Sequence, residues 1–323
     1  MSLSPREAEL FRAADPWGFI LFARNIDRPD QVLRLTQSLR ESVGRDAPVL
    51  IDQEGGRVQR MGPPHWRAWT PPLEFVAGLL DGYRAEAMSL RYRLIAYELR
   101  AVGIDVNCAP TLDIARPETH PFLCDRCYAE RADEVARMGR AVVDGLTAGG
   151  VLPVIKHMPG HGRSEVDSHK DLPRVKAPKV DIFQDWAPFQ ALADAALGMT
   201  AHIVFDALDA QLPATQSPTV VRLMREEIGF EGLLMTDDIS MEALLGDVVD
   251  RARASLAAGI DIILHCNGRF DEMEALAADI PHLSANAVIR AERALARRNA
   301  PDPFDADSAA ARLATLTLEA AHA

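Results

Sequence analysis

The sequence predicts an α/β fold, a TIM-type (β/α)8 barrel, from three observations. Apolar runs rich in β-branched residues alternate with amphipathic helical segments along the 323 residues. The runs are continuous rather than alternating, which is typical of parallel strands covered on both faces. Nearly every run is followed by ionisable or hydrogen-bonding side chains. A barrel brings all such strand ends to one mouth, whereas an open doubly wound sheet uses mainly the strands beside its switch point.

The elements follow from this pattern in chain order. A helix is expected over residues 5–14 at the start of the chain, and outer helices over the Ala-, Arg- and Leu-rich residues 283–323. Strands are expected at 18–23, 48–51, 104–108, 152–155, 199–205, 232–235 and 260–264. Helices are expected between them at 30–43, 86–101, 133–148, 180–196 and 241–258. Helix C-caps are expected at the glycines that stand at or just before several strands, namely Gly18, Gly103, Gly150, Gly198 and Gly259.

This pattern contains seven strands, one fewer than a complete barrel. Because the chain opens on a helical segment that leads into the strand at 18–23, the missing strand would be the first, before Met1. We find one repeating unit and no linker, so a single barrel domain is expected over residues 1–323.

Composition and charge narrow the possible partners and location. The net charge of −12 and the pI of about 5.2 argue against nucleic acid and anionic membrane surfaces as partners. No apolar run approaches the roughly 20 residues of a membrane span. The N-terminus is polar and lacks the apolar centre of a signal peptide, so a cytoplasmic protein is expected.

The cysteines and glycines give no sign of a metal or a cofactor. Four cysteines in so long a chain do not form a disulfide framework. Cys124 and Cys127 have CxxC spacing with His120 nearby, but no second Cys/His pair follows, which favours incidental thiols over a zinc or redox site. No glycine-rich phosphate-binding motif follows the early strands, so no nucleotide cofactor is expected.

Three stretches contain the candidate functional residues. The first is the run Asp-Gln-Glu-Gly-Gly-Arg-Val-Gln-Arg from Asp52 to Arg60. Carboxylate oxygens that accept and guanidinium groups that donate suit the hydroxyls of a sugar. A salt-bridged loop without function explains the same residues equally well.

The second stretch begins at Lys156 and His157, directly after an apolar run, and continues through a Pro-Gly-His-Gly turn. Lys156 and His157 can donate to hydroxyls or to an amide carbonyl. Asp167 and His169 stand two residues apart, so in an extended segment they share a face, and the carboxylate can orient the imidazole for proton transfer. The alternative is a metal site formed by His157, His161 and His169.

The third stretch is Met-Thr-Asp-Asp-Ile-Ser-Met, in which a strand delivers Asp237 and Asp238 to the mouth. Adjacent side chains of a strand point to opposite sides. One carboxylate is therefore expected on the barrel axis, placed to attack a substrate, and the other in the loop or at a helix N-cap. The alternative is that both acids cap the following helix.

Taken together, the three stretches resemble glycoside hydrolase family 3, and within it the bacterial β-N-acetylhexosaminidases of peptidoglycan recycling. The resemblance runs from about Gly18 to Asn267. It implies a retaining hydrolysis in which Asp237 is the nucleophile and His169, oriented by Asp167, is the acid/base. It also implies sugar contacts from Asp52, Arg60, Lys156 and His157, and no cofactor. Arg126 matches a further family arginine, although its Asp125-Arg126-Cys127-Tyr128 setting departs from the family's Arg-Ser-Phe.

The resulting expectation is an exo-acting hydrolase that removes terminal β-linked N-acetylglucosamine from muropeptide or anhydro-muropeptide fragments. A family 3 β-glucosidase is the nearest alternative, but such relatives generally draw their acid from a second domain for which this chain has no room. A non-catalytic sugar-binding barrel is the alternative from another class, and an open-sheet cofactor enzyme is disfavoured by the missing phosphate-binding motif.

Overall fold

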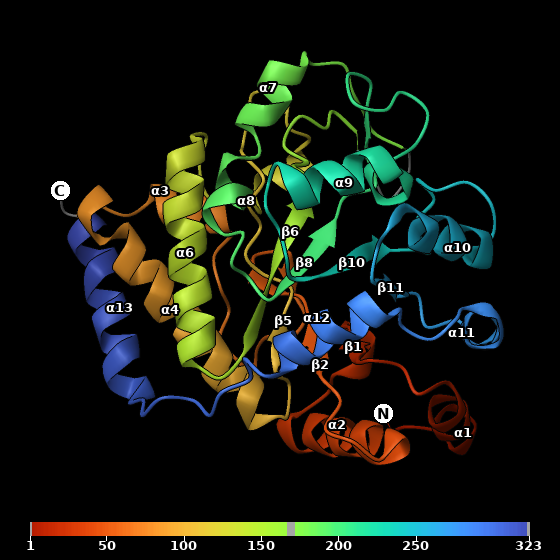
Figure 1. Ribbon diagram of the computed structural model, residues 1–323. Helices are drawn as coiled ribbons and strands as arrows, with labels where there is room; N and C mark the ends of the chain where they lie inside the picture. Colours follow the sequence, from red (N-terminus) through yellow and green to blue (C-terminus); the bar gives the residue numbers. More distant parts are fainter. Residues whose placement is uncertain (1, 167–171, 322–323) are drawn as a thin grey trace. The chain divides into compact units, whose positions relative to one another are not determined.

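The computed structural model describes residues 2–166 and 172–321 (Figure 1). The chain divides into two compact units. Unit 1 comprises Met1–Pro110, Arg140–Pro153 and Arg297–Ala323, and unit 2 comprises Thr111–Gly139 and Val154–Ala296. Strand β6 (Leu152–Met158) and helix α6 (Ala132–Ala148) each begin in one unit and end in the other.

The sheet of unit 1 is parallel throughout. Strand β1 (Phe19–Leu21) pairs with β2 (Val49–Ile51), β2 with β5 (Val106–Asn107), and β5 with the first residues of β6. The residues of β2 and β5 are all buried, as expected for strands covered on both faces. A short antiparallel pair, β3 (Gln53–Gly55) and β4 (Val58–Gln59), follows β2.

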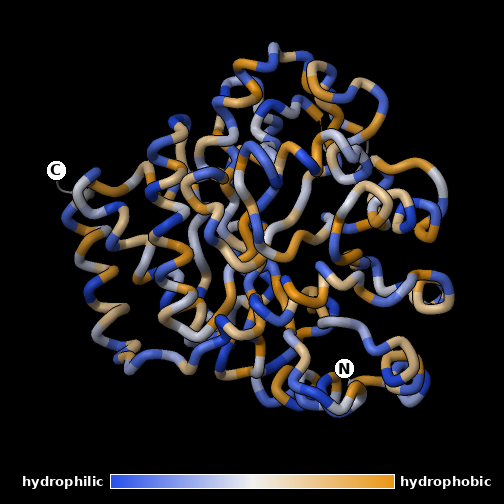
Figure 2. Tube along the Cα trace, viewed as in Figure 1, coloured by the Kyte–Doolittle hydropathy of each residue, from blue (hydrophilic) through white to orange (hydrophobic). Residues whose placement is uncertain are grey.

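The helices of unit 1 begin and end at recognisable signals. Helix α1 (Pro5–Ala14) opens with a capping box between Ser4 and Glu7, and α2 (Pro29–Val43) ends at Gly44, whose φ is 65°. The remaining helices are α3 (Pro72–Ala77), α4 (Arg84–Ala101), the second half of α6, and α13 (Ala306–Ala321). Apolar and polar residues alternate along α13 (Figure 2), and its apolar side packs on α4 through Leu313 and Leu316.

The sheet of unit 2 is also parallel. The later part of β6 pairs with β8 (Leu197–Thr200), β8 with β10 (Leu233–Asp238), and β10 with β11 (Ile262–Leu264). A separate two-stranded sheet joins β7 (Arg174–Val175) to β9 (Val204–Phe205).

Among the helices wholly within unit 2, α5 precedes β6 in the sequence, and the others lie between the strands or after the last of them. In chain order these helices are α5 (Pro121–Cys124), α7 (Lys179–Gln184), α8 (Ala187–Ala191), α9 (Pro218–Glu226), α10 (Val248–Ala258), α11 (Phe270–Asp279) and α12 (Ala285–Leu295). Within the part of the chain that the structure describes, no helix combines the length and apolar composition needed to cross a bilayer.

The strand order confirms the predicted fold class. The large sheet runs β1-β2-β5-β6-β8-β10-β11, so its strands are hydrogen-bonded in the order in which they occur in the chain. An open doubly wound sheet reverses its order at a switch point, whereas a TIM-type barrel adds each new strand beside the last. The seven strands of this sheet correspond to the seven predicted runs.

Three predicted elements differ in detail. The run at 199–205 is divided between β8 and β9, because the chain leaves the large sheet after Thr200 and pairs with β7 instead. The helix predicted at 180–196 is two short helices, α7 and α8, with a break at Asp185 and Trp186. The helix predicted from 241 begins only at Val248, where the Asp247 side chain accepts from the N–H groups of Val249 and Asp250.

Two of the five predicted glycine caps are wrong. Gly259 is a left-handed C-cap, and Gly103 and Gly150 have positive φ just after helices. Gly198 instead lies inside β8, where a Cβ atom would come within 2.8 Å of the Phe230 ring, and a Cβ atom on Gly18 would lie 2.8 Å from the Pro48 carbonyl oxygen. Close packing, rather than helix capping, therefore explains why these two positions are glycine.

Candidate active site

Asp237 stands at the carboxyl end of β10 in unit 2. One of its carboxylate oxygens accepts from the backbone N–H of Asp238 at 2.8 Å. Withdrawal from water raises the pKa of this carboxyl, but His157, His202, the Asp238 N–H and the Lys156 ammonium more than offset that effect and hold the pKa below its usual value. Asp237 is therefore ionised at neutral pH.

Asp238, its neighbour, has a different task. Its carboxylate accepts from the Ser240 N–H at 3.0 Å, from the Ser240 hydroxyl at 2.7 Å and from the Cys266 N–H at 3.0 Å. These bonds join the turn after β10 to the segment after β11. The adjacent acids thus divide as their alternation on a strand predicts, and Asp238 supports a loop rather than a helix N-terminus.

Lys156 and His157 lie near the end of β6, joined by a cis peptide, and both are buried. The Nδ1 atom of His157 is 2.7 Å from Asp113 Oδ2, and its Nε2 atom is 3.2 Å from Arg126 Nη2. Three side chains from separate segments of unit 2 therefore form one buried row. Asp113 is part of it although no sequence motif singled it out.

His161 lies in the glycine-rich turn after β6, with its backbone N–H bound to Asp113 Oδ1 at 2.6 Å. Its ring is 5.9 Å from that of His157, and its Nδ1 atom has no hydrogen-bond partner within the described residues. Burial lowers the pKa of His161 to about 4, so the ring is neutral at pH 7.

His202 follows β8 and contacts the nucleophile candidate's strand. Its Nε2 atom is 3.0 Å from the backbone carbonyl oxygen of Asp238, which can only accept, so Nε2 carries the proton. Its Nδ1 atom is 2.8 Å from the Thr215 hydroxyl. Burial lowers the pKa of His202, which keeps this tautomer neutral and ties β8 to the end of β10.

The motif from Asp52 to Arg60 forms the β3–β4 hairpin of unit 1. Arg60 Nη2 lies 3.1 Å from Asp52 Oδ2, and both side chains are partly exposed. The Gln53 side chain fixes the hairpin by accepting from the N–H groups of Arg60 and Met61 and donating to the Met61 carbonyl. At Gly55, with φ of 109°, a Cβ atom would overlap the buried Arg91 guanidinium, so this position requires glycine.

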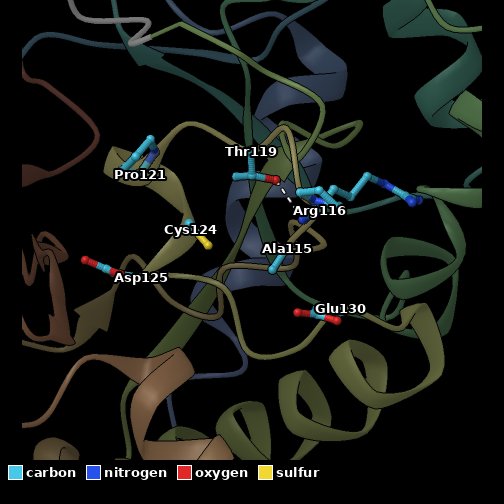
Figure 3. A pocket seen from close by; sticks show the side chains of 8 residues that line it. Ala115, Arg116, Thr119, Pro121, Cys124, Asp125 and Glu130 are labelled. Atoms are coloured by element: carbon cyan, nitrogen blue, oxygen red, sulfur yellow. Dashed lines mark hydrogen bonds between the residues drawn. The ribbon is translucent and has the colours of Figure 1, made fainter.

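A cavity of about 490 Å³ opens beside the segment that contains Arg126 (Figure 3). It is lined by Ala115, Arg116, Pro117, Thr119, Pro121, Cys124, Asp125 and Glu130. The CxxC cysteines are free thiols in the structure, Cys124 at this cavity and Cys127 buried with its Sγ 3.5 Å from the Leu123 carbonyl oxygen.

The predicted site residues thus fall into three groups. Arg126, Lys156, His157 and Asp237 come together in unit 2, and Asp52 pairs with Arg60 in unit 1. Asp167 and His169 lie outside the described residues. No cluster of three potential metal ligands occurs within the ranges that the structure describes, and His169 of the alternative metal site lies outside them.

Sequence reasoning missed Asp113 and gave His202 no role. Asp113 lies several residues beyond the end of β5, so it does not stand where a strand-end acid is expected. The available signal was an acid between two apolar neighbours, Leu112 and Ile114. Burying a carboxylate there costs free energy unless hydrogen-bond donors satisfy it.

Comparisons with known proteins identify the family. Residues 6–297 match the family model described as the N-terminal domain of glycosyl hydrolase family 3. A β-hexosaminidase from Alkalilimnicola ehrlichii is 37% identical over 290 residues, which cover 87% of this chain and 81% of that protein. A β-hexosaminidase from Vibrio cholerae is 35% identical over 283 residues, covering 85% of this chain and 82% of the relative.

Solved structures agree with this family. NagZ from Neisseria gonorrhoeae, in complex with N-trifluoroacetyl-D-glucosamine, superposes with a TM-score of 0.83 at 29% identity, covering 99% of this chain and 93% of that one. A family 3 β-N-acetylglucosaminidase from Paenibacillus gives a TM-score of 0.86 at 29% identity, and the match covers 98% of this chain but 65% of the longer Paenibacillus protein. The chain therefore belongs to glycosyl hydrolase family 3 and is a glycoside hydrolase of the β-N-acetylhexosaminidase type.

Proposed function

We propose that the chain is a retaining exo-β-N-acetylglucosaminidase that removes terminal β-linked N-acetylglucosamine from muropeptide and anhydro-muropeptide fragments during peptidoglycan recycling. The observation on which the proposal rests is the environment of Asp237. A carboxylate kept ionised beside Lys156 and His157, at the carboxyl end of a barrel strand, has the position and charge of a glycosidase nucleophile.

The proposed reaction has two steps. Asp237 attacks the anomeric carbon while the bond to the leaving oxygen breaks, and His169, held by Asp167, donates a proton to that oxygen. Water then attacks the glycosyl-enzyme, with His169 accepting its proton, and the β configuration is restored. Asp52, Arg60, Arg126, Lys156 and His157 bind the sugar, and no cofactor takes part.

Support for the sugar comes from the relatives, one of which is named a β-N-acetylglucosaminidase while another was solved with an N-acylated glucosamine. Support for the muropeptide aglycone is the resemblance of the three sequence motifs to recycling enzymes. We also propose a cytoplasmic location, which suits a chain whose four cysteines are free thiols. Residues 1–323 would act as a single hydrolase domain, since β6 and α6 each contribute to both units.

The nucleophile is tested by changing Asp237 to alanine. We expect kcat/KM for p-nitrophenyl β-N-acetylglucosaminide to fall by about 10⁴-fold or more, because the glycosyl-enzyme no longer forms. Added azide should restore turnover of this variant and give the α-glycosyl azide, since it attacks the open face directly. In the wild type, a fluorinated sugar that traps the glycosyl-enzyme should label Asp237, and a label on any other residue would refute the mechanism.

The substrate is tested by comparing leaving groups and sugars in the wild type. We expect p-nitrophenyl β-N-acetylglucosaminide to be preferred over the β-glucoside. An N-acetylglucosaminyl-anhydro-N-acetylmuramic acid disaccharide should be cleaved with higher kcat/KM than chitobiose. Preference for the glucoside would indicate a β-glucosidase, and binding of N-acetylglucosamine without turnover would indicate a non-catalytic barrel.

A further inference from the structure

Asp113 makes two short hydrogen bonds from a buried carboxylate that the proposed reaction does not use. Its side chain is about 1% exposed. Oδ2 lies 2.7 Å from His157 Nδ1, and Oδ1 accepts from the His161 backbone N–H at 2.6 Å. The preceding residues run alongside β6, with Thr111 bridged to Lys156 and the Leu112 N–H bound to the Lys156 carbonyl, so Asp113 is held in place by the backbone.

The chemistry of the neighbours fixes the proton positions in this row. The Arg126 guanidinium only donates, so His157 Nε2 must accept from Arg126 Nη2 and carries no proton. His157 Nδ1 must then carry the proton of the neutral ring and donate it to Asp113. Both ring nitrogens of His157 are thus hydrogen-bonded, and the imidazole orients one of the five N–H donors of the Arg126 guanidinium.

The second carboxylate oxygen of Asp113 acts on a different segment. His161 lies in the glycine-rich turn after β6, and the chain continues from this turn toward Asp167 and His169. Asp113 accepts from the backbone N–H of His161 and so holds this turn. Two residues of the segment that follows Asp113 also bind the backbone next to His161. The Thr119 hydroxyl donates to the Gly162 carbonyl, and the His120 N–H donates to the Ser164 carbonyl at 2.8 Å.

We propose that Asp113 is a positioning residue that sets two parts of the site at once. One oxygen fixes the His157 tautomer and through it the Arg126 guanidinium, and the other holds the His161 backbone at the start of the segment that leads to the proposed acid/base. In this arrangement His157 contributes to sugar binding by orienting the Arg126 guanidinium. The catalytic part of this inference rests on the proposed function.

The test variant is Asp113→Asn, which keeps the size of the side chain but offers one acceptor and one donor where the site needs two acceptors. Whichever way the amide turns, either His157 or the His161 N–H faces a donor. We expect kcat/KM to fall by about 10- to 100-fold for aryl N-acetylglucosaminides, the loss that a displaced catalytic group produces.

Leaving-group dependence separates positioning from general damage. A phenyl glycoside needs protonation of its leaving oxygen, whereas a 2,4-dinitrophenyl glycoside needs little, and kcat/KM reports the step in which that bond breaks. Asp113→Asn should therefore lower kcat/KM much more for the phenyl than for the dinitrophenyl substrate. Equal losses for the two substrates would overturn the link between Asp113 and the proposed acid/base.

The tautomer is read independently of activity by ¹⁵N NMR of histidine-labelled protein, with the His157 signals assigned from their loss in His157→Gln. The wild type should show a protonated Nδ1 and an unprotonated Nε2 at neutral pH. The opposite tautomer would overturn the row of hydrogen bonds even if Asp113→Asn failed to fold. If the wild type proved inactive on N-acetylglucosaminides, the proposed function would fail while this measurement still decided the positioning claim.

Asp261→Asn is the matched control. Asp261 is also a buried acceptor in unit 2, bound to the Leu234 N–H at 2.9 Å and to Arg225 and Arg290, and it acts near the start of β10. This variant should lose stability but keep the wild-type ratio of phenyl to dinitrophenyl kcat/KM and the wild-type His157 signals. A changed ratio in the control as well would show that any buried Asp→Asn change produces the effect, and would overturn the assignment to Asp113.

Discussion

At the scale of single residues, the site places ionisable groups of one type in environments that give them different tasks. Asp237 accepts from the Asp238 N–H, and the Lys156 ammonium helps to keep it ionised, while the adjacent Asp238 accepts from three donors and serves as a structural acceptor. Position on the strand decides this division, because successive side chains face opposite sides.

His161 predicts a pH dependence of stability. Its pKa is about 4 when folded and ordinarily 6.5, so the unfolded chain binds the extra proton first and stability is lost as the pH falls from 6.5 toward 4. A lowering of the His161 pKa by this amount corresponds to a loss of about 3 kcal/mol in the free energy of unfolding. His161→Gln should remove that part of the loss, measured as the difference in the denaturant-derived unfolding free energy between pH 7 and pH 4.

The control is the exposed His282, whose change to glutamine should leave the pH dependence of the wild type intact. His202, whose pKa is also lowered by burial, contributes in the same direction and remains in both variants. If His161→Gln loses as much stability as the wild type over this range, the ring is not held neutral by its environment.

At the scale of elements, close approach of helices depends on glycines that no capping rule explains. Helix α6 passes α4 at Gly145, where a Cβ atom would lie 2.4 Å from the Ser89 carbonyl oxygen. The obstructing atom belongs to the α4 backbone and cannot turn aside as a side chain can. Gly145 therefore sets the distance between the two helices of unit 1.

Gly145→Ala should accordingly destabilise the protein, although alanine is by itself the better helix former by about 1 kcal/mol. The steric conflict should exceed this gain and give a net loss of about 1–3 kcal/mol, seen as a lower Tm. Gly82→Ala, at a position with open space around the added carbon, should change stability by less than about 0.5 kcal/mol. An unchanged or raised Tm for Gly145→Ala would contradict the close contact.

At the scale of the whole molecule, the chain returns at its end to the unit in which it began. Residues from 297 onward contact the first stretch of unit 1, Met1–Pro110, through the Arg298–Asp105 ion pair at 2.9 Å, the Arg312–Glu86 pair, and the packing of α13 on α4. Unit 1 is therefore assembled from three separate stretches of sequence, and its core is complete only when the last helix is in place.

Leu316→Ala should show this dependence. Leu316 is fully buried in the cluster that includes Leu94 and Leu313, and its truncation leaves a cavity that costs about 2–5 kcal/mol. Leu318→Ala changes an exposed leucine of the same helix and should leave the Tm nearly unchanged. Equal Tm values for the two variants would mean that α13 is not part of the core of unit 1.

Much of this organisation could be predicted from the sequence because the responsible signals are local. Continuous apolar runs located all seven strands of the large sheet, and the polar residues at the carboxyl ends of β6 and β10 located Lys156, His157 and Asp237. The division of the 199–205 run could not be predicted, since Thr200 and Val204 are equally good strand formers and only the pairing of Val204 with Arg174 in β7 separates them.

The sequence by itself determined the fold class, the family and the residues proposed for chemistry, because periodicity and motif spacing are properties of neighbouring residues. Only the tertiary structure decided what surrounds those residues. Asp113 and His202 come from other segments of unit 2, and the proton on His157 is fixed by a carboxylate 44 positions away in the chain. Such contacts depend on three-dimensional packing, which no local pattern encodes.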